Sequence, residues 1–449
     1  MWRRLMEDAR PRRLAVALLV YAAATGVYFA LAAKQTITTH TPFNHFALLA
    51  ESWLQERLDL GGPPPAYAQN NDFASFEGKW YVTFPPFPAI LLVPWVKLGG
   101  SAINVQDGQF FIWLGGIAPA VLFLVLEKLR RMEIGLRSTF ANVVLTVGFA
   151  FGTVYFFTVP QGTVWFAAHV VGAALCALYA LFAIGAERPV LAGLMLGLGF
   201  ATRSPLVFAA PLFAFEAVRV SLRASEISAP ESVGGRVRHF FGRLDLRALA
   251  SRLALFSVPA LAVLGLMLWH NQARFHDPFE FGYRFLTVAW KGRMEKWGLF
   301  SYHYLGRNLA VVLTSLPWVP KPPTDVPFQI SHHGLAIWVT SPLYLWLLWP
   351  RKKTYLHLAL WLSVAAIAVP TLFYQNTGWM QFGYRFSNDY AVLLFCLIAI
   401  GGYRMRGLFW LALLWSIAVN SFGAVSFARS KFDKFYHSDP SQRVLHQPD

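Results

Sequence analysis

The string Phe-Gly-Tyr-Arg-Phe occurs twice in this chain, at residues 281–285 and again at 382–386. Each copy carries an arginine, Arg284 in the first and Arg385 in the second. A guanidinium group suits bidentate contacts to phosphate or carboxylate, and the glycine allows close approach of the backbone. The alternative is a chance repeat whose arginines extend to water at a membrane surface. We interpret both arginines as candidates for binding an anionic substrate.

Other charged residues accompany these strings. Arg274 and Glu280 lie close to the first copy, and Asp389 follows the second at the start of an apolar run. Arg203 stands between two apolar stretches, shortly before Pro205. A lone arginine in such a place needs an anionic partner or an aqueous cavity. We expect all four to belong to a substrate-binding site.

A third polar region lies between the first two long apolar runs. From Asn44 to Leu58 the apolar residues recur with helical spacing, which predicts an amphipathic helix on the membrane surface. Asn44 and His45 begin this helix, and Asp72 and Glu77 follow it. The alternative is a polar surface loop in which Asn44 merely caps the helix. A connector this long is typical of functional loops, so we favour function for the region as a whole.

Long apolar runs must position these groups. The chain is 56% hydrophobic and only 14% charged, with 17 Trp, 16 Tyr and 39 Phe, whereas soluble domains carry about 25% charged residues. We predict an all-α polytopic membrane protein with about eleven transmembrane helices, in a range of ten to thirteen. The predicted spans are 14–33, 109–126, 138–158, 163–185, 189–203, 205–219, 250–270, 333–350, 354–373, 388–402 and 407–427.

Residues 85–100 decide the topology. If this proline-rich run does not cross, the five arginines before the first span and the seven arginines in 219–252 all lie on the cytoplasmic side. We therefore predict an interfacial helix at 85–100 and a multi-pass protein of the inner (cytoplasmic) membrane with a cytoplasmic N-terminus. Residues 1–427 then form one membrane domain with large external loops at 34–108 and 271–332, followed by a short tail at 428–449.

Several functions are excluded by composition or by missing motifs. The net charge of +16 sets topology and does not indicate nucleic acid, because no aromatic-basic platform accompanies it. Cys176 and Cys396 lie inside apolar runs, so we infer no disulfide, metal or redox role. The sequence contains no Walker A loop and no HExxH motif, which argues against ATP-driven transport and zinc hydrolysis.

The layout resembles the GT-C superfamily of polyprenyl-phosphate-sugar-dependent glycosyltransferases, especially bacterial protein-mannosyltransferase-like and aminoarabinose-transferase-like members. The resemblance covers roughly residues 14–427 and depends on these segments: NHFALLAESWLQERLDL, GKWYVTFPPFPAILLVP, GFATRSPLVFAAP, NQARFHDPFEFGYRF and QFGYRFSNDY. The family commonly places an aspartate just before the surface helix, where this chain has Pro42-Phe43-Asn44-His45.

The resemblance implies an external cavity in which a sugar passes from a polyprenyl-phosphate donor to an acceptor. It implies an acidic base in the first external loop and basic groups that hold the lipid phosphate. Because no aspartate precedes the surface helix, either Asp72 or His45 takes the role of the base, or catalysis is altered or absent. We predict that Asp72, with His45 close by, supplies acid–base catalysis, and that Arg203 and Arg385 hold the lipid phosphate. The remaining substrate-binding candidates are Asn44, Arg274, Glu280, Arg284 and Asp389. We expect no cofactor, with a divalent metal ion left open, and the expected partners are the polyprenyl-phosphate-linked sugar and membrane lipids.

The alternative function is a non-enzymatic transporter or scramblase of a lipid-linked substrate. Such a protein would carry functional polar groups inside its spans, near the middle of the membrane. Here the apolar runs contain almost no carboxylates, and the polar residues gather in the external segments. The sequence therefore favours glycosyl transfer.

Overall fold

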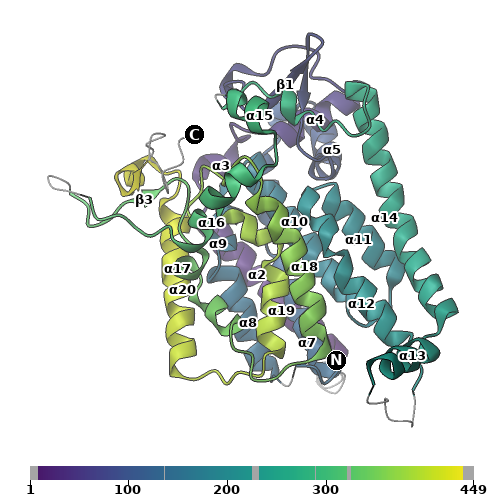
Figure 1. Ribbon diagram of the computed structural model, residues 1–449. Coiled ribbons are helices and arrows are strands. Elements are labelled where there is room, and N and C mark those ends of the chain that lie inside the picture. Colours follow the sequence, from purple (N-terminus) through teal and green to yellow (C-terminus); the bar gives the residue numbers. More distant parts are fainter. Residues whose placement is uncertain (1–8, 136, 225–231, 289, 321–324, 438–449) are drawn as a thin grey trace.

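The computed structural model describes residues 9–135, 137–224, 232–288, 290–320 and 325–437, and it is predominantly helical (Figure 1). Within these residues, six helices are long and apolar enough to cross a membrane, and a seventh crossing is added if a helix pair bent by 52° counts as one span. The six are Arg10–Leu31, Asp107–Arg131, Val164–Ala186, Leu246–Phe275, Tyr355–Leu372 and Gly407–Ser426. The chain is a polytopic helical membrane protein.

This number is smaller than the eleven spans that the apolar runs predict. The helices α11 (Pro189–Phe200) and α19 (Ala391–Ile400) have 12 and 10 residues. At about 1.5 Å per residue they fall short of the ~30 Å hydrocarbon core. The predicted spans at 205–219 and 333–350 are interrupted, because each contains a 3₁₀ helix with proline near its start. Hydropathy alone does not register such breaks.

The helices of the membrane domain, in chain order, are α2 (Ala9–Leu31), α6 (Asp107–Gly115), α7 (Ile117–Arg131), α8 (Thr139–Phe151), α9 (Tyr155–Thr158), η3 (Val159–Gln161), α10 (Val164–Ala183), η4 (Ile184–Ala186), α11, η5 (Ser204–Ala209), α12 (Ala210–Val220), α13 (Val233–Arg243), α14 (Leu246–Phe275), α17 (Ile337–Thr340), η8 (Pro342–Leu347), α18 (Tyr355–Leu372), η9 (Arg385–Asp389), α19 and α20 (Gly407–Ser426). The external segments contain α3 (Lys34–Thr38), α4 (His45–Leu54), η1 (Ala66–Ala68), β1 (Phe73–Phe76), β2 (Lys79–Val82), α5 (Phe87–Gly99), η2 (Ala102–Asn104), η6 (Tyr283–Phe285), α15 (Lys291–Trp297), η7 (Tyr302–Tyr304), α16 (Leu305–Leu313), β3 (Ile330–Ser331), η10 (Ser430–Phe435) and β4 (Tyr436–His437).

In the first external segment, helix α4 is buried on more of its surface than a helix that lies on a membrane would be. Helix α4 ends at Leu54, four residues earlier than predicted, and seven of its ten residues are buried. It packs against α5, whose 13 residues again fall short of a full crossing. Strands β1 and β2 form an antiparallel hairpin closed by Glu77 and Gly78, both with positive φ. Two short sheets, β1–β2 and β3–β4, therefore depart from the predicted all-α class.

Helix α10 occupies the centre of the membrane domain, whereas the 30-residue helix α14 runs along its outer edge (Figure 1). Burial agrees with these positions. In the most apolar 18-residue stretch of each span, 83% is buried for the span that contains α10, against 17% for α14. The N-terminus and the arginine-rich α13 lie at one end of the domain, and β1, α4 and α5 lie at the other. Part of the predicted tail is ordered, because β4 pairs with β3, and residues 438–449 lie outside the described residues.

Candidate active site

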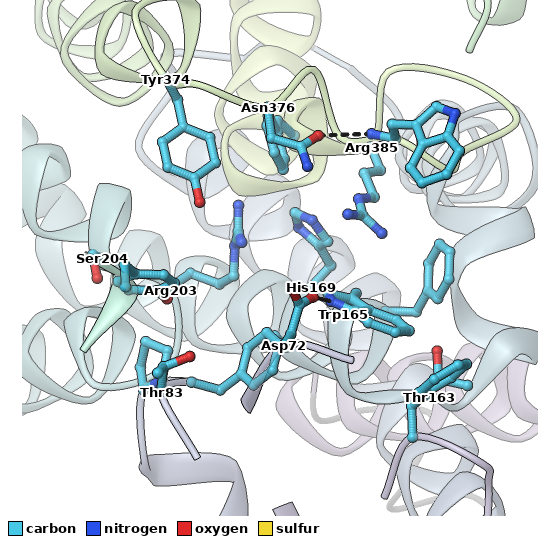
Figure 2. A pocket seen from close by; sticks show the side chains of 18 of the residues that line it. Asp72, Thr83, Thr163, Trp165, His169, Arg203, Ser204, Tyr374, Asn376 and Arg385 are labelled. Carbon is cyan, nitrogen blue, oxygen red and sulfur yellow. Dashed lines mark hydrogen bonds between the residues drawn. The ribbon is translucent and has the colours of Figure 1, made fainter. Parts of the chain in front are cut away.

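A cavity of about 920 Å³ opens where the external segments meet the membrane helices. Its wall combines the loop before β1, the first turns of α10, the turn after α11, the segment from Phe279 to Leu286, and the segment from Pro370 to Phe386. Figure 2 shows the side chains of Asp72, His169, Arg203 and Arg385 converging on this space. Segments that are far apart in the sequence thus supply the charged groups of one site.

Asp72 lines the cavity on the side of the first external segment. Its backbone has a φ of 61°, a left-handed conformation that aspartate tolerates better than most residues, and it directly precedes β1. The indole Nε1 of Trp165, in the first turn of α10, donates a hydrogen bond of 2.7 Å to Asp72 Oδ2. Burial raises the pKa of the Asp72 carboxyl above its ordinary 3.8, opposed by the Trp165 hydrogen bond and the charge of Arg385. The carboxylate is therefore suited to accepting a proton.

His45 lies behind the loop that carries Asp72 and does not line the cavity. Its ring is fully buried, stacks on Phe73 at a centroid distance of 4.2 Å, and has Nε2 2.8 Å from the carbonyl oxygen of Asn71. Burial lowers the pKa of His45 to about 4, so the ring is neutral at pH 7. The structure gives His45 a role in supporting the loop and no direct access to a substrate in the cavity.

Asn44 and Arg274 are likewise buried away from the cavity. Asn44 is the N-cap residue of α4 without a side-chain capping bond, and its Oδ1 accepts a hydrogen bond of 3.1 Å from the hydroxyl of Tyr67. Arg274 donates to the carbonyl oxygen of Val82 at 2.8 Å and to Asn271 Oδ1 at 2.9 Å. The bond to Val82 ties the end of α14 to the hairpin, and the bond from Tyr67 joins Asn44 to the loop before β1, so both side chains have structural uses.

The opposite wall contains a buried ion pair. Arg203 follows α11 in an extended conformation, and its Nε and Nη2 donate to the two carboxylate oxygens of Asp389 at 3.0 and 2.7 Å. Asp389 is fully buried in η9 and does not itself line the cavity, while the Arg203 side chain is 20% exposed and does. Nδ1 of His169, on α10, lies 3.1 Å from Asp389 Oδ1. Asp389 therefore fixes two side chains that face the cavity.

Among the described residues, Arg385 differs from Arg203 in having no carboxylate paired with its guanidinium group. It is 7% exposed, lines the cavity, and has its guanidinium carbon 5.1 Å from the ring centre of Phe166. Within the described parts of the chain its guanidinium forms no hydrogen bond and no ion pair, although its backbone N–H donates to Gln381 Oε1 at 2.8 Å. A buried cation of this kind calls for an anionic ligand.

Glu280 and Arg284 lie at the rim of the cavity. They form an ion pair of 2.5 Å, and Glu280 Oε1 also accepts a hydrogen bond of 2.6 Å from the N–H of Gly282. The Arg284 side chain is 64% exposed. Both residues line the cavity, but each neutralises the charge of the other, so neither needs a ligand to balance its charge.

Sequence reasoning did not identify Trp165 and His169. Both lie within the apolar run at 163–185, whose composition predicts only a span. They are four residues apart and so occupy the same face of α10. A histidine inside an apolar span is costly to bury and often marks a functional site, which was the available signal.

No group of three or more His, Cys, Asp or Glu side chains that could hold a metal ion occurs among the residues whose placement is described. The carboxylates on the cavity wall are Asp72 and, at the rim, Glu280. Oxygen-rich ligand sets are needed for Mg²⁺ or Ca²⁺. We therefore assign no step to a metal.

Two solved structures resemble this chain. One is the oligosaccharyltransferase of Archaeoglobus fulgidus in its apo form, with a TM-score of 0.52 and 14% identity over 95% of this chain and 57% of that one. The fold of this chain is therefore similar to that of the archaeal oligosaccharyltransferase. The other is the oligosaccharyltransferase AglB of the same organism, in complex with an inhibitory peptide and a dolichol-phosphate, with a TM-score of 0.47 and 11% identity over 95% and 56%.

The chain spans a little over half the length of these solved structures, and at such identity the likeness concerns the fold alone. No protein-family model matches the sequence. No curated protein matches it significantly. The function must therefore be argued from the geometry of the cavity.

Proposed function

We propose that the protein is an integral membrane glycosyltransferase that transfers a sugar from a polyprenyl-phosphate donor to an acceptor at the external face of the membrane. The observation that carries the proposal is Arg385, a buried guanidinium that faces the same cavity as Asp72 and has no hydrogen-bond or ion-pair partner among the described residues. A lipid phosphate supplies the missing anion, and a carboxylate with a raised pKa supplies a base. The GT-C-like fold supports this combination.

The reaction follows from these two groups. A hydroxyl of the acceptor attacks the anomeric carbon of the donor sugar, and its proton passes to Asp72. The bond from that carbon to the phosphate oxygen breaks, with both electrons going to the phosphate. The leaving phosphate gains one negative charge, which Arg385 and Arg203 stabilise in a site of low dielectric. Asp389 keeps Arg203 oriented through two hydrogen bonds.

The arrangement of the ends of the molecule supports an external site. Arginine-rich segments of membrane proteins stay on the cytoplasmic side, and α13 lies at the end opposite to β1 and α4 (Figure 1). We therefore place the N-terminus in the cytoplasm of a cell with an inner membrane, and the cavity on the outer side. A donor carried by a membrane lipid then reaches the cavity without leaving the bilayer.

The test uses purified full-length protein in nanodiscs, a panel of undecaprenyl-phosphate sugars radiolabelled in the sugar, and a membrane extract as the source of acceptors. The expected result is consumption of at least one donor with release of undecaprenyl phosphate, lost in Asp72→Asn. Glu77→Gln is the matched control, since Glu77 is an exposed carboxylate in the hairpin turn of the same segment. If no donor is consumed by folded wild-type protein, the proposed function is wrong.

A further inference from the structure

His169, on the cavity wall, has a ring nitrogen that the proposed reaction does not use. The side chain is 1% exposed and lines the cavity. Its Nδ1 is engaged by Asp389, whereas Nε2 is buried and has no hydrogen-bond partner among the described residues. An unpaired buried nitrogen costs free energy unless a ligand satisfies it.

The partner of Nδ1 fixes the tautomer. An ionised carboxylate only accepts hydrogen bonds, so Nδ1 carries the ring proton and Nε2 presents a lone pair. The charge of Asp389 is already balanced by two hydrogen bonds from Arg203, and among the described residues no other carboxylate is paired with the ring. The imidazole therefore offers an acceptor, and its ligand must bring an O–H or N–H group.

The position of His169 indicates which part of the substrate it meets. Trp165, which holds Asp72, lies one helical turn before it on the same face of α10. Arg203, which is proposed to hold phosphate, shares the Asp389 carboxylate with it. His169 thus lies beside both the base and the phosphate site, and in Figure 2 its ring lies between the guanidinium groups of Arg203 and Arg385, above Asp72. The transferred sugar must lie there too, because its anomeric carbon is bonded to phosphate and attacked by the acceptor.

Only two atoms of the sugar ring adjoin the anomeric carbon, namely the ring oxygen and C2. The ring oxygen is an acceptor and would oppose the lone pair of Nε2, whereas a substituent on C2 can donate. Resting on the proposed function, we propose that His169 Nε2 accepts a hydrogen bond from the C2 substituent of the donor sugar. His169 then selects sugars with a hydroxyl or acylamino group at C2 against 2-deoxy sugars.

The test compares three donors, undecaprenyl-phosphate glucose, mannose and 2-deoxyglucose. The 2-deoxy donor serves both hexoses, because glucose and mannose differ only in configuration at C2. Wild-type protein should prefer a hexose over the 2-deoxy donor by about tenfold or more in kcat/KM, since a buried acceptor is otherwise left unpaired. His169→Phe should lower kcat/KM for the hexose by a similar factor and leave the 2-deoxy donor nearly unaffected.

Two further variants separate recognition from folding. His169→Gln retains an acceptor oxygen near Nε2 and should recover part of the preference. His270→Phe is the matched control, because His270 is a buried histidine on α14 that lies outside the cavity. It should keep the full wild-type preference.

The outcomes divide clearly. If folded wild-type protein consumes no donor in the wider panel, the proposed function fails and this inference fails with it. If wild-type protein transfers sugar but uses the 2-deoxy donor equally well, only the C2 contact is wrong. A loss of equal size on both donors in His169→Phe would also overturn it, since that would indicate a base or a structural support. Should His169→Phe not fold, His169→Leu replaces it with the same expectation, and equal use of both donors by the wild-type protein still overturns the contact.

Discussion

The two copies of Phe-Gly-Tyr-Arg-Phe have the same sequence but different surroundings. In the first copy, Arg284 is largely exposed at the rim and is paired with Glu280. In the second copy, Arg385 is buried in the cavity wall between aromatic rings and has no protein partner within the described chain. The glycines differ as well, since Gly282 has a φ of +84° whereas Gly383 does not have a positive φ.

The difference shows that the local string does not set the role of its arginine. What decides is whether a neighbouring carboxylate neutralises the charge and whether water can reach it. Glu280 neutralises Arg284 from within the same loop. The two charges that act most strongly on Arg385 are Arg203, which repels it, and Asp72, which attracts it. The positive charge of Arg385 can therefore bind an added anion. The following predictions test this contrast, beginning with the largest expected effect.

Asp389→Ala should be the most destabilising change. It removes a fully buried carboxylate from beneath Arg203 and His169, and loss of one partner from a buried ion pair typically costs about 3–5 kcal/mol. Glu280→Gln removes the partner of the exposed Arg284 and should cost only ~0–1 kcal/mol. Thermal unfolding of the two variants in the same detergent measures the difference. Equal unfolding temperatures would show that the two arginines do not differ as described.

Asp72→Asn should reduce turnover by at least ~100-fold while leaving donor binding nearly intact, because general-base catalysis contributes about 10²–10⁴-fold. Glu280→Gln should reduce turnover by less than about fivefold, because an exposed ion pair contributes little. Steady-state kinetics with the donor identified from the panel provide the measurement. A wild-type rate in folded Asp72→Asn would remove Asp72 from the mechanism.

The pH dependence should follow Asp72. Only the ionised carboxylate accepts a proton, and burial raises its pKa, so kcat/KM should rise as the pH passes through the raised value and then level off. Trp165→Phe removes a hydrogen bond that stabilises the ionised form, and it should shift this rise to higher pH. Glu280→Gln should leave the rise where it is. A shift to lower pH in Trp165→Phe would contradict the assignment of the base.

The membrane fold could be predicted from the sequence because apolar length and arginine placement are local properties. The number of full crossings could not, since the short helices α11 and α19 have the hydropathy of spans but not their length. The packing partner of α4 could not be predicted from the sequence either. Its apolar residues fit a membrane surface, but they pack on α5 instead, and that choice depends on tertiary contacts.

The candidate site shows the same limit. The structure places Arg203, Arg385 and Asp72 around one cavity. It places Asp389 beneath Arg203, and it buries His45, Asn44 and Arg274 outside the cavity. Which way a buried polar side chain points is set by partners distant in sequence; the Asp389–His169 contact joins residues 220 positions apart. Spacing along the chain contains no information about such a pair.

The central claim is that Arg385, and not its counterpart Arg284, holds the phosphate of a polyprenyl lipid. The most direct measurement is the dissociation constant of undecaprenyl phosphate for wild-type protein, Arg385→Ala and Arg284→Ala in nanodiscs. Arg385→Ala should weaken binding roughly tenfold to a hundredfold, as expected for a charge-assisted contact of about 1.5–3 kcal/mol, and Arg284→Ala by less than about fivefold. Unchanged affinity in folded Arg385→Ala, or an equal loss in both variants, would contradict the account.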